Sequence, residues 1–401
     1  MNIARINMSH AKEDQVRSVV DLIRKLSDKL DRRVGIMMDT QGPAIRTGDL
    51  PTALNLNPGE RIVLTVRGET SEEHHSVDVN YEHLVDDISV GDIVLVDNGN
   101  IHLKVVEKRH NQLHCDVLTE GVLGSRRHIN LPGVRVNLPA LTDKDLRDIE
   151  LGIELGVDFF AMSFVREAQD VLKLKGILDY HKSPQQIIAK LEDQQGLRNV
   201  DEIIGVADAV MVARGDLGIE CPYEELPIIQ RRVVKHCIAL GKPVIVATHM
   251  LESMIDNPLP TRAEITDVAN AIFEQADCIM LSGETSVGQH PLACLEVMDR
   301  VARRTERSGG AGFALEAVLD SDRAKMMRAA CVMAEDLHAD ALIVFTRKGK
   351  NARNISWLRP LKTPIYAFTD CEYLCNQLTI NWGTLPFCID FSETDPAENV
   401  V

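Results

Sequence analysis

Short apolar runs alternate with longer amphipathic segments over most of the chain. Between residues 140 and 307 the apolar runs lie at residues 157–164, 186–190, 209–213, 243–248 and 277–282. The segments between them have helical spacing; one at residues 225–240 follows Pro222 and ends before Gly241. Buried strands that alternate with helices are typical of a parallel sheet covered by helices.

Two further units of the same kind precede these runs. Strands at residues 3–7 and 34–39 flank a helix around residues 12–30, which brings the count to seven β/α units. A closed barrel of this type has eight strands. We therefore expect an α/β protein whose catalytic domain, residues 1–42 and 132–308, is a (β/α)8-type TIM barrel lacking its first β/α unit.

Residues 43–131 break the alternation. This stretch contains strand-like segments such as RIVLTV and DIVLVDNGNIHLKVVE, with turn signals at Asn57 and at Asn98-Gly99. Inserted after a barrel strand, it is predicted to form a small β-barrel lid domain over the catalytic face. Beyond the glycine-rich segment 308–312, helices at residues 323–337 and from residue 350 alternate with strands at residues 341–345 and 365–368. They predict a C-terminal α/β domain, residues 309–401, with an incomplete sheet.

Composition narrows the class of partner. The 401 residues include 44 Lys and Arg against 60 Asp and Glu, for a formal net charge of -16. This balance argues against a nucleic-acid partner or an anionic membrane surface, although a local positive pocket is allowed. The nine cysteines show no repeated spacing, and no stretch approaches a membrane span, so we expect a cytoplasmic protein with reduced thiols.

Charged and hydroxyl side chains follow three successive strands. Lys190 and Glu192 are two residues apart and so share one side of their strand. An isolated Lys-x-Glu sequence is more often a surface ion pair. Here, however, it stands at the carboxyl end of a predicted barrel strand, which is where active sites of such barrels lie. Asp216 follows the next strand and could bind Mg2+ or Mn2+ together with Glu192. Thr248 ends the strand after that.

Two arginines stand near other strand ends. Arg5 shares a face with Asn7 on the first strand, and Arg46 follows the segment that begins at Asp39. Either arginine alone could merely pair with an acid. Together with Lys190 in an acidic protein, they indicate a multiply charged phosphate ligand.

The chain resembles the pyruvate kinase family in sequence motifs that run in the family's order. The matching stretches are ARINMSH (residues 4–10), DTQGPAIRTG (39–48), IIAKLEDQQGLRNVDEI (187–203), MVARGDLGIE (211–220), GKPVIVATHMLESMIDNPLPTRAEITDVANAI (241–272) and DCIMLSGETSVGQHP (277–291). The resemblance implies transfer of a phosphoryl group from phosphoenolpyruvate to ADP, giving pyruvate and ATP.

The resemblance also implies roles for individual residues. Lys190 would stabilise the transferring phosphoryl group, Arg5 would hold the phosphate, and Thr248 would lie near the carbon that is protonated. Glu192 and Asp216 would bind the divalent cation. Arg46 would be a catalytic residue that contacts the transferring phosphoryl group or the nucleotide phosphates. The remaining implied positions are the backbone of Ala213, Arg214, Gly215 and Asp216 for the substrate carboxylate, His10 with Arg46 for the nucleotide, Asn7, Ser9, Asp39 and Thr40 for a monovalent cation such as K+, and Ser163 and Phe164 for a further active-site stretch.

Some features depart from the family pattern. Ala44 occupies a position where K+-dependent members commonly carry Glu, which leaves the K+ requirement open. The resemblance further implies a homotetramer and a chain that is truncated at both its N- and C-terminal ends. Two alternatives stay open: a catalytically impaired structural or regulatory homologue, and a metal-dependent pyruvate aldolase or lyase that forms an enolate.

Overall fold

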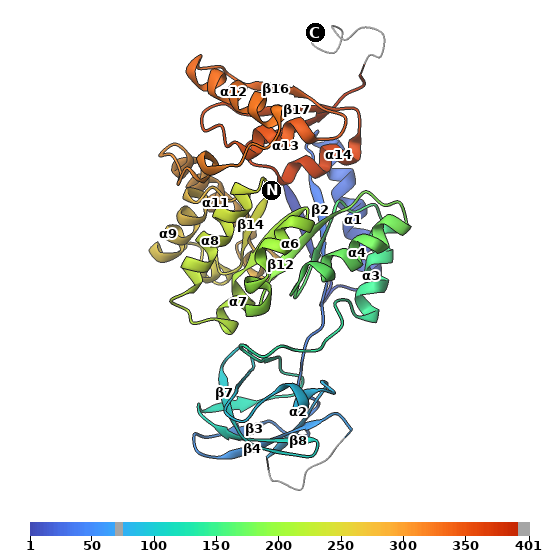
Figure 1. Ribbon diagram of the computed structural model, residues 1–401, viewed down its shortest axis with the longest axis vertical. Coiled ribbons are helices and arrows are strands. Elements are labelled where there is room, and N and C mark those ends of the chain that lie inside the picture. The colour runs from blue at the N-terminus through green and yellow to red at the C-terminus, as the bar shows by residue number, and fades with distance from the viewer. Residues whose placement is uncertain (69–74, 392–401) are drawn as a thin grey trace.

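The computed structural model describes residues 1–68 and 75–391, so parts of the predicted lid and C-terminal domains, residues 69–74 and 392–401, lie outside the described residues. In the described part, three bodies follow one another along the long axis: the inserted β domain, the barrel domain and the C-terminal domain (Figure 1). A β-rich body is thus inserted between elements of the α/β barrel.

A seven-stranded, wholly parallel sheet forms the centre of the barrel domain, in the order β1-β2-β11-β12-β13-β14-β15. Its strands are β1 (Ile3–Asn7), β2 (Gly35–Asp39), β11 (Phe159–Met162), β12 (Gln186–Leu191), β13 (Ala209–Ala213), β14 (Val244–Ala247) and β15 (Cys278–Met280). The sequence predicted all seven strands. Three runs, 157–164, 243–248 and 277–282, were predicted too long at their carboxyl ends. In the first two, Phe164 (φ 53°) and Thr248 (φ 70°) leave the extended conformation.

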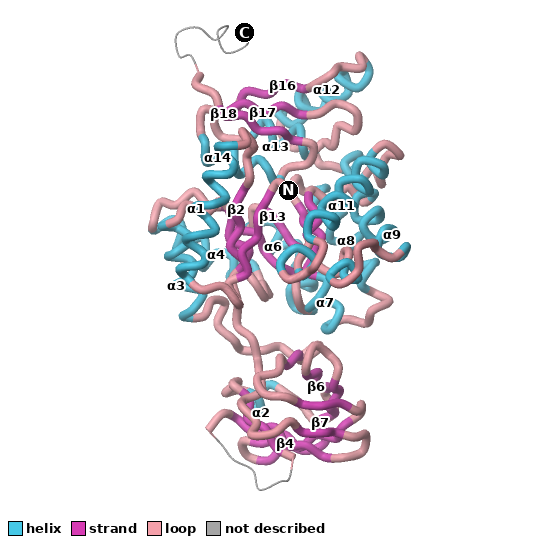
Figure 2. Tube along the Cα trace, turned by 180° about the vertical axis from the view of Figure 1, so that it is seen from behind, coloured by secondary structure: helices cyan, strands magenta, loops and turns pink. Residues whose placement is uncertain are grey.

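Helices cover the outside of this sheet, and Figure 2 shows them on both sides of the strands. They are α1 (Glu13–Lys29), α3 (Asp143–Glu154), α4 (Ala168–Tyr180), α5 (Gln194–Arg198), α6 (Val200–Val206), α7 (Arg214–Glu220), α8 (Leu226–Ala239), α9 (Arg262–Phe273), α10 (Gly283–Ser286) and α11 (Pro291–Glu306). Strand residues alternate between the two sides. On β12, Ile187, Ala189 and Leu191 pack against helices, while Ile188 faces the barrel interior. Lys190 is therefore an interior position.

The inserted domain is a β structure with its own core. Its elements are β3 (Leu54–Leu56), β4 (Arg61–Val66), β5 (Ser76–Val79), α2 (Leu84–Asp87), β6 (Ile93–Val96), β7 (Ile101–Arg109), β8 (Gln112–Val117), β9 (Gly121–Leu123) and β10 (Ile129–Asn130). Six strands form one sheet and β3 pairs with β9. The domain lies beyond the carboxyl ends of the barrel strands (Figure 1).

The C-terminal domain packs against the amino ends of the barrel strands. It contains α12 (Asp322–Asp336), β16 (Leu342–Phe345), α13 (Lys350–Trp357), β17 (Ile365–Thr369), α14 (Glu372–Gln377) and β18 (Thr384–Cys388), with the strands in one parallel sheet. The sequence analysis missed α14 and β18. Ile380, between them, is 1 % exposed and joins the apolar cluster of the barrel interior, so this domain closes the end of the barrel at which the strands begin.

Candidate active site

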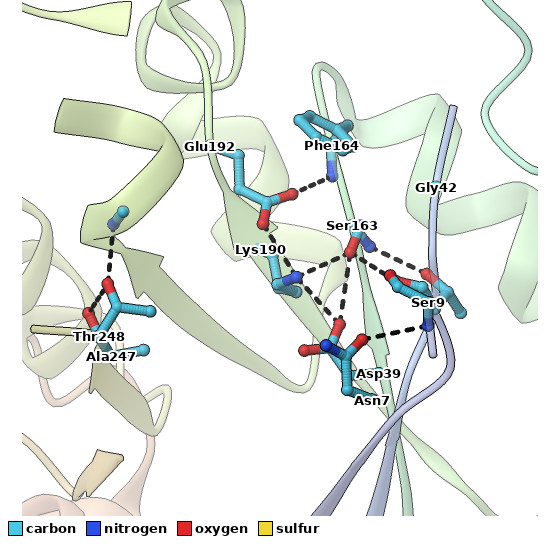
Figure 3. Close-up of polar contacts among 12 residues, drawn as sticks. Asn7, Ser9, Asp39, Gly42, Ser163, Phe164, Lys190, Glu192, Ala247 and Thr248 are labelled. Atoms are coloured by element: carbon cyan, nitrogen blue, oxygen red, sulfur yellow. Dashed lines mark hydrogen bonds and ion pairs between the residues drawn. The ribbon is translucent and has the colours of Figure 1, made fainter. Parts of the chain in front are cut away.

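The interior face of the sheet becomes polar at the carboxyl ends of the strands. On β1, β2 and β12 the interior positions that follow Ile3, Met37 and Ile188 are taken by charged or amide side chains. These are Arg5 and Asn7 on β1, Asp39 on β2, and Lys190 with Glu192 at the end of β12. Residues far apart in the sequence thus lie side by side at one edge of the barrel (Figure 3). We call this edge the rim.

Lys190 is the centre of a hydrogen-bonded cluster. Its Nζ lies 2.9 Å from Asp39 Oδ1, 2.9 Å from Glu192 Oε1 and 2.7 Å from Ser163 Oγ. The residue is only 7 % exposed. Burial alone would lower the pKa of Lys190, but the carboxylates of Asp39 and Glu192 outweigh burial and raise it. Lys190 is therefore a permanent cation whose direction is set by three partners.

Asp39 joins Lys190 to Arg5. Its second oxygen, Oδ2, accepts a hydrogen bond from Arg5 Nε at 2.6 Å, and the residue is 1 % exposed. Burial would raise the pKa of Asp39, yet the two adjacent cations hold it below its usual range. Both cations are thereby oriented by one buried carboxylate.

Glu192 and Asp216 supply carboxylates from neighbouring strands. Glu192 Oε2 accepts from the backbone N–H of Phe164 at 2.6 Å, and Asp216 stands in the first turn of α7, directly after β13. Burial raises the pKa of Glu192 to about 7 in spite of Lys190, and the nearby Asp216 carboxylate adds to the increase. Two carboxylates that repel each other are stabilised by a shared cation, so this pair fits a divalent metal ion. Among the described residues, no group of three or more His, Cys, Asp or Glu side chains has the arrangement of a metal site.

A cavity of about 350 Å³ opens at the rim between the barrel and the inserted domain. It is lined by most of the residues predicted from the sequence, together with Ala44: Arg5, Asn7, Ser9, His10, Thr40, Arg46, Lys190, Glu192 and Asp216. Ser163 and Phe164 line it as well. The structure thus brings together the predicted phosphate, nucleotide and metal residues in one cavity.

The oxygen atoms predicted to bind a monovalent cation also converge at the rim. Asn7 and Asp39 are partners in the pairing of β1 with β2. Asn7 Oδ1 accepts from the Ser9 N–H at 3.1 Å, and the Thr40 carbonyl accepts from Ser163 Oγ at 2.7 Å. A set of oxygen ligands suits a hard cation.

Other predicted residues lie beside this cavity rather than on its wall. Thr248 Oγ1 accepts from the Gly215 N–H at 2.7 Å and donates to the Ala247 carbonyl at 2.6 Å (Figure 3). Arg214 is 6 % exposed, and its side chain lines a different cavity, beside α8 and α9. Only the backbone of Arg214 can therefore serve the predicted carboxylate site.

The inserted domain contributes residues that the sequence analysis missed. Asp97, Asn98, Arg127 and His128 line the same cavity, and Arg127 pairs with Asp97 at 3.1 Å. Burial lowers the pKa of His128, against the opposing effect of Asp216. The Asn98-Gly99 turn and the two adjacent arginines, Arg126 and Arg127, were visible in the sequence. Nothing local showed that both would return to the rim, since that depends on how the inserted domain folds.

Fold and site together define a class: a parallel β/α barrel with a β domain inserted at its rim and a buried Lys–carboxylate cluster suited to binding an anionic substrate with a metal ion. A family model described as "Pyruvate kinase, barrel domain" matches residues 1–295, and one described as "Pyruvate kinase, alpha/beta domain" matches residues 324–401. The chain belongs to the pyruvate kinase family.

Individual relatives agree with this assignment. A pyruvate kinase from Staphylococcus epidermidis is 39 % identical over 409 residues, covering 99 % of this chain and 69 % of the relative. One from Geobacillus stearothermophilus is 42 % identical over 397 residues, covering 96 % of this chain and 66 % of the relative. A crystal structure of a pyruvate kinase from Cryptosporidium parvum superposes with a TM-score of 0.94 at 33 % identity, covering 100 % of this chain and 84 % of that one. The family and fold class predicted from the sequence are confirmed.

Proposed function

We propose that this protein transfers the phosphoryl group of phosphoenolpyruvate to ADP, giving pyruvate and ATP, as a phosphotransferase of glycolysis. The observation that carries the proposal is the cluster of buried Lys190, Asp39 and Glu192 with the partly exposed Arg5 at the rim, in a chain that belongs to the pyruvate kinase family. In the reaction the bond between the enol oxygen and phosphorus breaks, a bond from a β-phosphate oxygen of ADP to phosphorus forms, and carbon 3 of the enolate takes up a proton.

The cations of the rim suit phosphoryl transfer. Negative charge on the moving group must be neutralised by donors that are already in place, because reorganising them during the reaction would cost rate. Lys190 and Arg5 are held by Asp39, so we assign Lys190 to the transferring phosphoryl and the enolate oxygen, and Arg5 to the phosphate. Arg46 and His10 lie on the wall of the cavity, and we assign them to the nucleotide phosphates.

A divalent cation, Mg2+ or Mn2+, would be held by Glu192 and Asp216. It would supply a positive charge that polarises substrate oxygens. Burial is the main cause of the raised pKa of Glu192, and the neighbouring Asp216 carboxylate adds to the increase, so a cation held between the two carboxylates would relieve their repulsion. For a monovalent cation such as K+ we propose Asn7, Ser9, Asp39 and Thr40, while Ala44 adds no carboxylate.

The inserted domain is proposed to act as a lid. Its residues Asp97 and Arg127 line the same cavity as Lys190, so movement of the domain toward the rim would exclude water that competes with ADP for the phosphoryl group. The proposed domain limits are residues 1–42 with 132–308, 43–131 and 309–401.

The experiment is a coupled pyruvate assay with phosphoenolpyruvate, ADP, Mg2+ and K+. We expect turnover by the wild type and a fall in kcat of at least about 100-fold for Lys190→Met, since one preorganised charge at the reacting group is removed. The matched control is Lys242→Met: this half-buried lysine donates to the Ala207 carbonyl at 2.6 Å at the amino ends of the strands and should leave kcat within about twofold.

Mn2+ titration tests the metal site separately. Glu192→Gln and Asp216→Asn should each weaken Mn2+ binding by about 10-fold or more, because each removes one of two charged ligands. A wild type that makes no pyruvate would refute the proposed function, and unchanged Mn2+ affinity in both variants would refute the metal assignment.

Assembly and location follow the resemblance to the family. We propose a homotetramer in the cytoplasm, which light scattering of the purified protein and fractionation of the source cells would test. Within the described residues, no helix combines the length and apolar character that crossing a membrane requires.

A further inference from the structure

The side chain of Arg214 turns away from the rim cavity and holds the end of the neighbouring strand. Its Nε lies 3.3 Å from the Ala247 carbonyl and 3.2 Å from the Thr248 carbonyl, and its Nη2 lies 2.5 Å from the Thr248 carbonyl. Its Nη1 donates to Asp267 at 2.6 Å and to Gln230 at 3.3 Å. The guanidinium thus binds two backbone carbonyls and two side chains at once.

The backbone that Arg214 holds is strained. Thr248 has a φ of 70° and His249 a φ of 56°, so two successive residues other than glycine adopt the left-handed conformation. This conformation is especially unfavourable for a β-branched residue such as threonine. It persists only where surrounding contacts enforce it, and the guanidinium supplies two donors to the carbonyl of Thr248 itself.

The strained turn determines where the Thr248 hydroxyl lies. Thr248 Oγ1 accepts from the Gly215 N–H, and Gly215 directly precedes Asp216, the proposed metal ligand. A side-chain carbon at position 215 would lie 3.5 Å from this oxygen, an ordinary van der Waals contact, so the hydrogen bond and not steric exclusion defines this approach. Hydrogen bonds of two kinds therefore join the end of β14 to the start of α7: those from the Arg214 side chain to the Thr248 carbonyl, and one from the Gly215 N–H to the Thr248 hydroxyl.

We propose that Arg214 is a positioning residue for the phosphoryl-transfer reaction: through the carbonyl of Thr248 it holds the strained turn that places the Thr248 hydroxyl against Gly215. The inference rests on the proposed function, in which Thr248 lies beside the substrate. It assigns the side chain of Arg214 a role distinct from the predicted contribution of its backbone to the carboxylate site.

Geometry makes this a task for arginine. The guanidinium is planar: its Nε and Nη2 donate to the two carbonyls, and its Nη1 donates to Asp267. One rigid group thus fixes the directions of all these hydrogen bonds. A lysine would keep the charge beside Asp267 but could not bind both carbonyls in that geometry. Arg214→Lys thus separates the positioning role from the mere presence of a buried cation.

The test compares turnover with binding. Because a displacement of about 1 Å in a reacting group costs about 100-fold in rate, Arg214→Lys should lower kcat by about 30- to 100-fold while the KM for phosphoenolpyruvate changes less than about threefold. The matched control is Arg359→Lys. Arg359 is likewise buried, pairs with Asp277 at 2.6 Å and donates to the Ser356 carbonyl, but it lies at the amino ends of the strands. It should lower the melting temperature and leave kcat within about threefold.

A double-mutant cycle identifies the path of the effect. If Arg214 acts through Thr248, then Arg214→Lys should add less than about twofold to the loss already caused by Thr248→Ala, whereas independent effects would multiply. Guanidinium ion added to Arg214→Ala should recover at least about tenfold in kcat, since it can occupy the vacated position.

Each outcome decides the inference. A loss of kcat for Arg214→Lys no greater than that for Arg359→Lys would overturn it, as would multiplying effects in the cycle or failure of guanidinium to restore kcat. Absence of pyruvate formation by the wild type would instead refute the proposed function, so the two failures are distinguishable.

Discussion

Glu220 is a buried carboxyl for which the proposed reaction has no use. It ends α7, is 8 % exposed, and accepts a hydrogen bond from Asn130 Nδ2 of β10 at 3.0 Å. Burial raises the pKa of Glu220 to about 7, although Asn130 opposes the increase, and the negative charges of Asp193 and Asp216 add to it. A side chain at the junction of barrel and inserted domain thus changes charge near neutral pH.

This shift predicts a pH-dependent stability. Because the pKa of Glu220 is higher in the folded state than its ordinary value of 4.5, the protonated carboxyl contributes to the free energy of unfolding. This contribution is complete below about pH 4.5 and is lost as the pH rises to about 7. Glu220→Gln keeps an acceptor for Asn130 and does not ionise. Relative to the wild type, its free energy of unfolding should therefore rise by about 1 to 3 kcal/mol between these pH values, measured by urea unfolding.

Glu264 provides a comparison of opposite sign. Burial would raise its pKa, but hydrogen bonds from Ser253 and Thr261 outweigh burial and lower it. Glu264→Gln should therefore lose stability at neutral pH and lose less at pH 3. If Glu220→Gln, like Glu264→Gln, lost more stability at neutral pH than at pH 3, the raised pKa assigned to Glu220 would be contradicted.

At the scale of elements, glycine decides how the chain leaves β2 for the inserted domain. Gly42 has a φ of 70° and is buried, and a Cβ there would lie 2.8 Å from Ser163 Cβ and 2.9 Å from Phe164 Cδ2. Its N–H donates to Asp145 Oδ1 at 3.1 Å. The turn therefore packs directly against the end of β11, beside Lys190.

Gly42→Ala should be strongly destabilising and should lower activity. The variant combines left-handed strain with an overpacked contact, which together cost about 2 to 5 kcal/mol, and pushes Ser163 toward Lys190. Gly156→Ala is the matched control, because Gly156 has a φ of 60° but nothing within 4 Å of its added Cβ. It should cost only about 1 to 2 kcal/mol by thermal unfolding and leave kcat unchanged. Equal losses for both variants would show that packing against Ser163 is unimportant.

At the scale of the whole molecule, a buried ion pair joins the barrel to the C-terminal domain. Arg359 Nη2 lies 2.6 Å from Asp277 Oδ2, the two side chains are 3 % and 1 % exposed, and the Trp382 N–H donates to Asp277 Oδ1. The Trp357 indole adds a hydrogen bond to the Ile238 carbonyl of α8. These contacts come from segments that the sequence separates by more than eighty residues.

Arg359→Met should lower stability by about 3 to 5 kcal/mol, because it leaves the Asp277 carboxylate buried without its cation. The exposed pair Arg303–Asp299, at 2.7 Å with side chains 70 % and 59 % exposed, provides the control. Arg303→Met should change stability by less than about 1 kcal/mol. Differential scanning calorimetry would measure both variants, and similar melting temperatures for the two would contradict the role given to Arg359.

Much of the architecture could be predicted from local pattern. Seven apolar runs alternating with helices identified the parallel sheet, and the two-residue strand period placed Lys190 with Glu192 on one side. Strand ends at Phe164 and Thr248 were placed too late, since both are apolar or β-branched and only their tertiary contacts hold them at positive φ. The two last elements of the C-terminal domain, α14 and β18, are short and were missed.

The sequence by itself determined the class of protein and its chemistry. Strand periodicity and residue types are local properties of the chain, and six motifs occur in the order typical of the family. Tertiary structure decided which groups meet. Asp39 binds Arg5 and Lys190 together, His128 and Arg127 return from the inserted domain to the rim, and the Arg214 side chain donates to the Thr248 carbonyl instead of lining the rim cavity. These contacts depend on distances between segments remote in sequence, which no local pattern encodes, and on burial, which sets the charge each group carries.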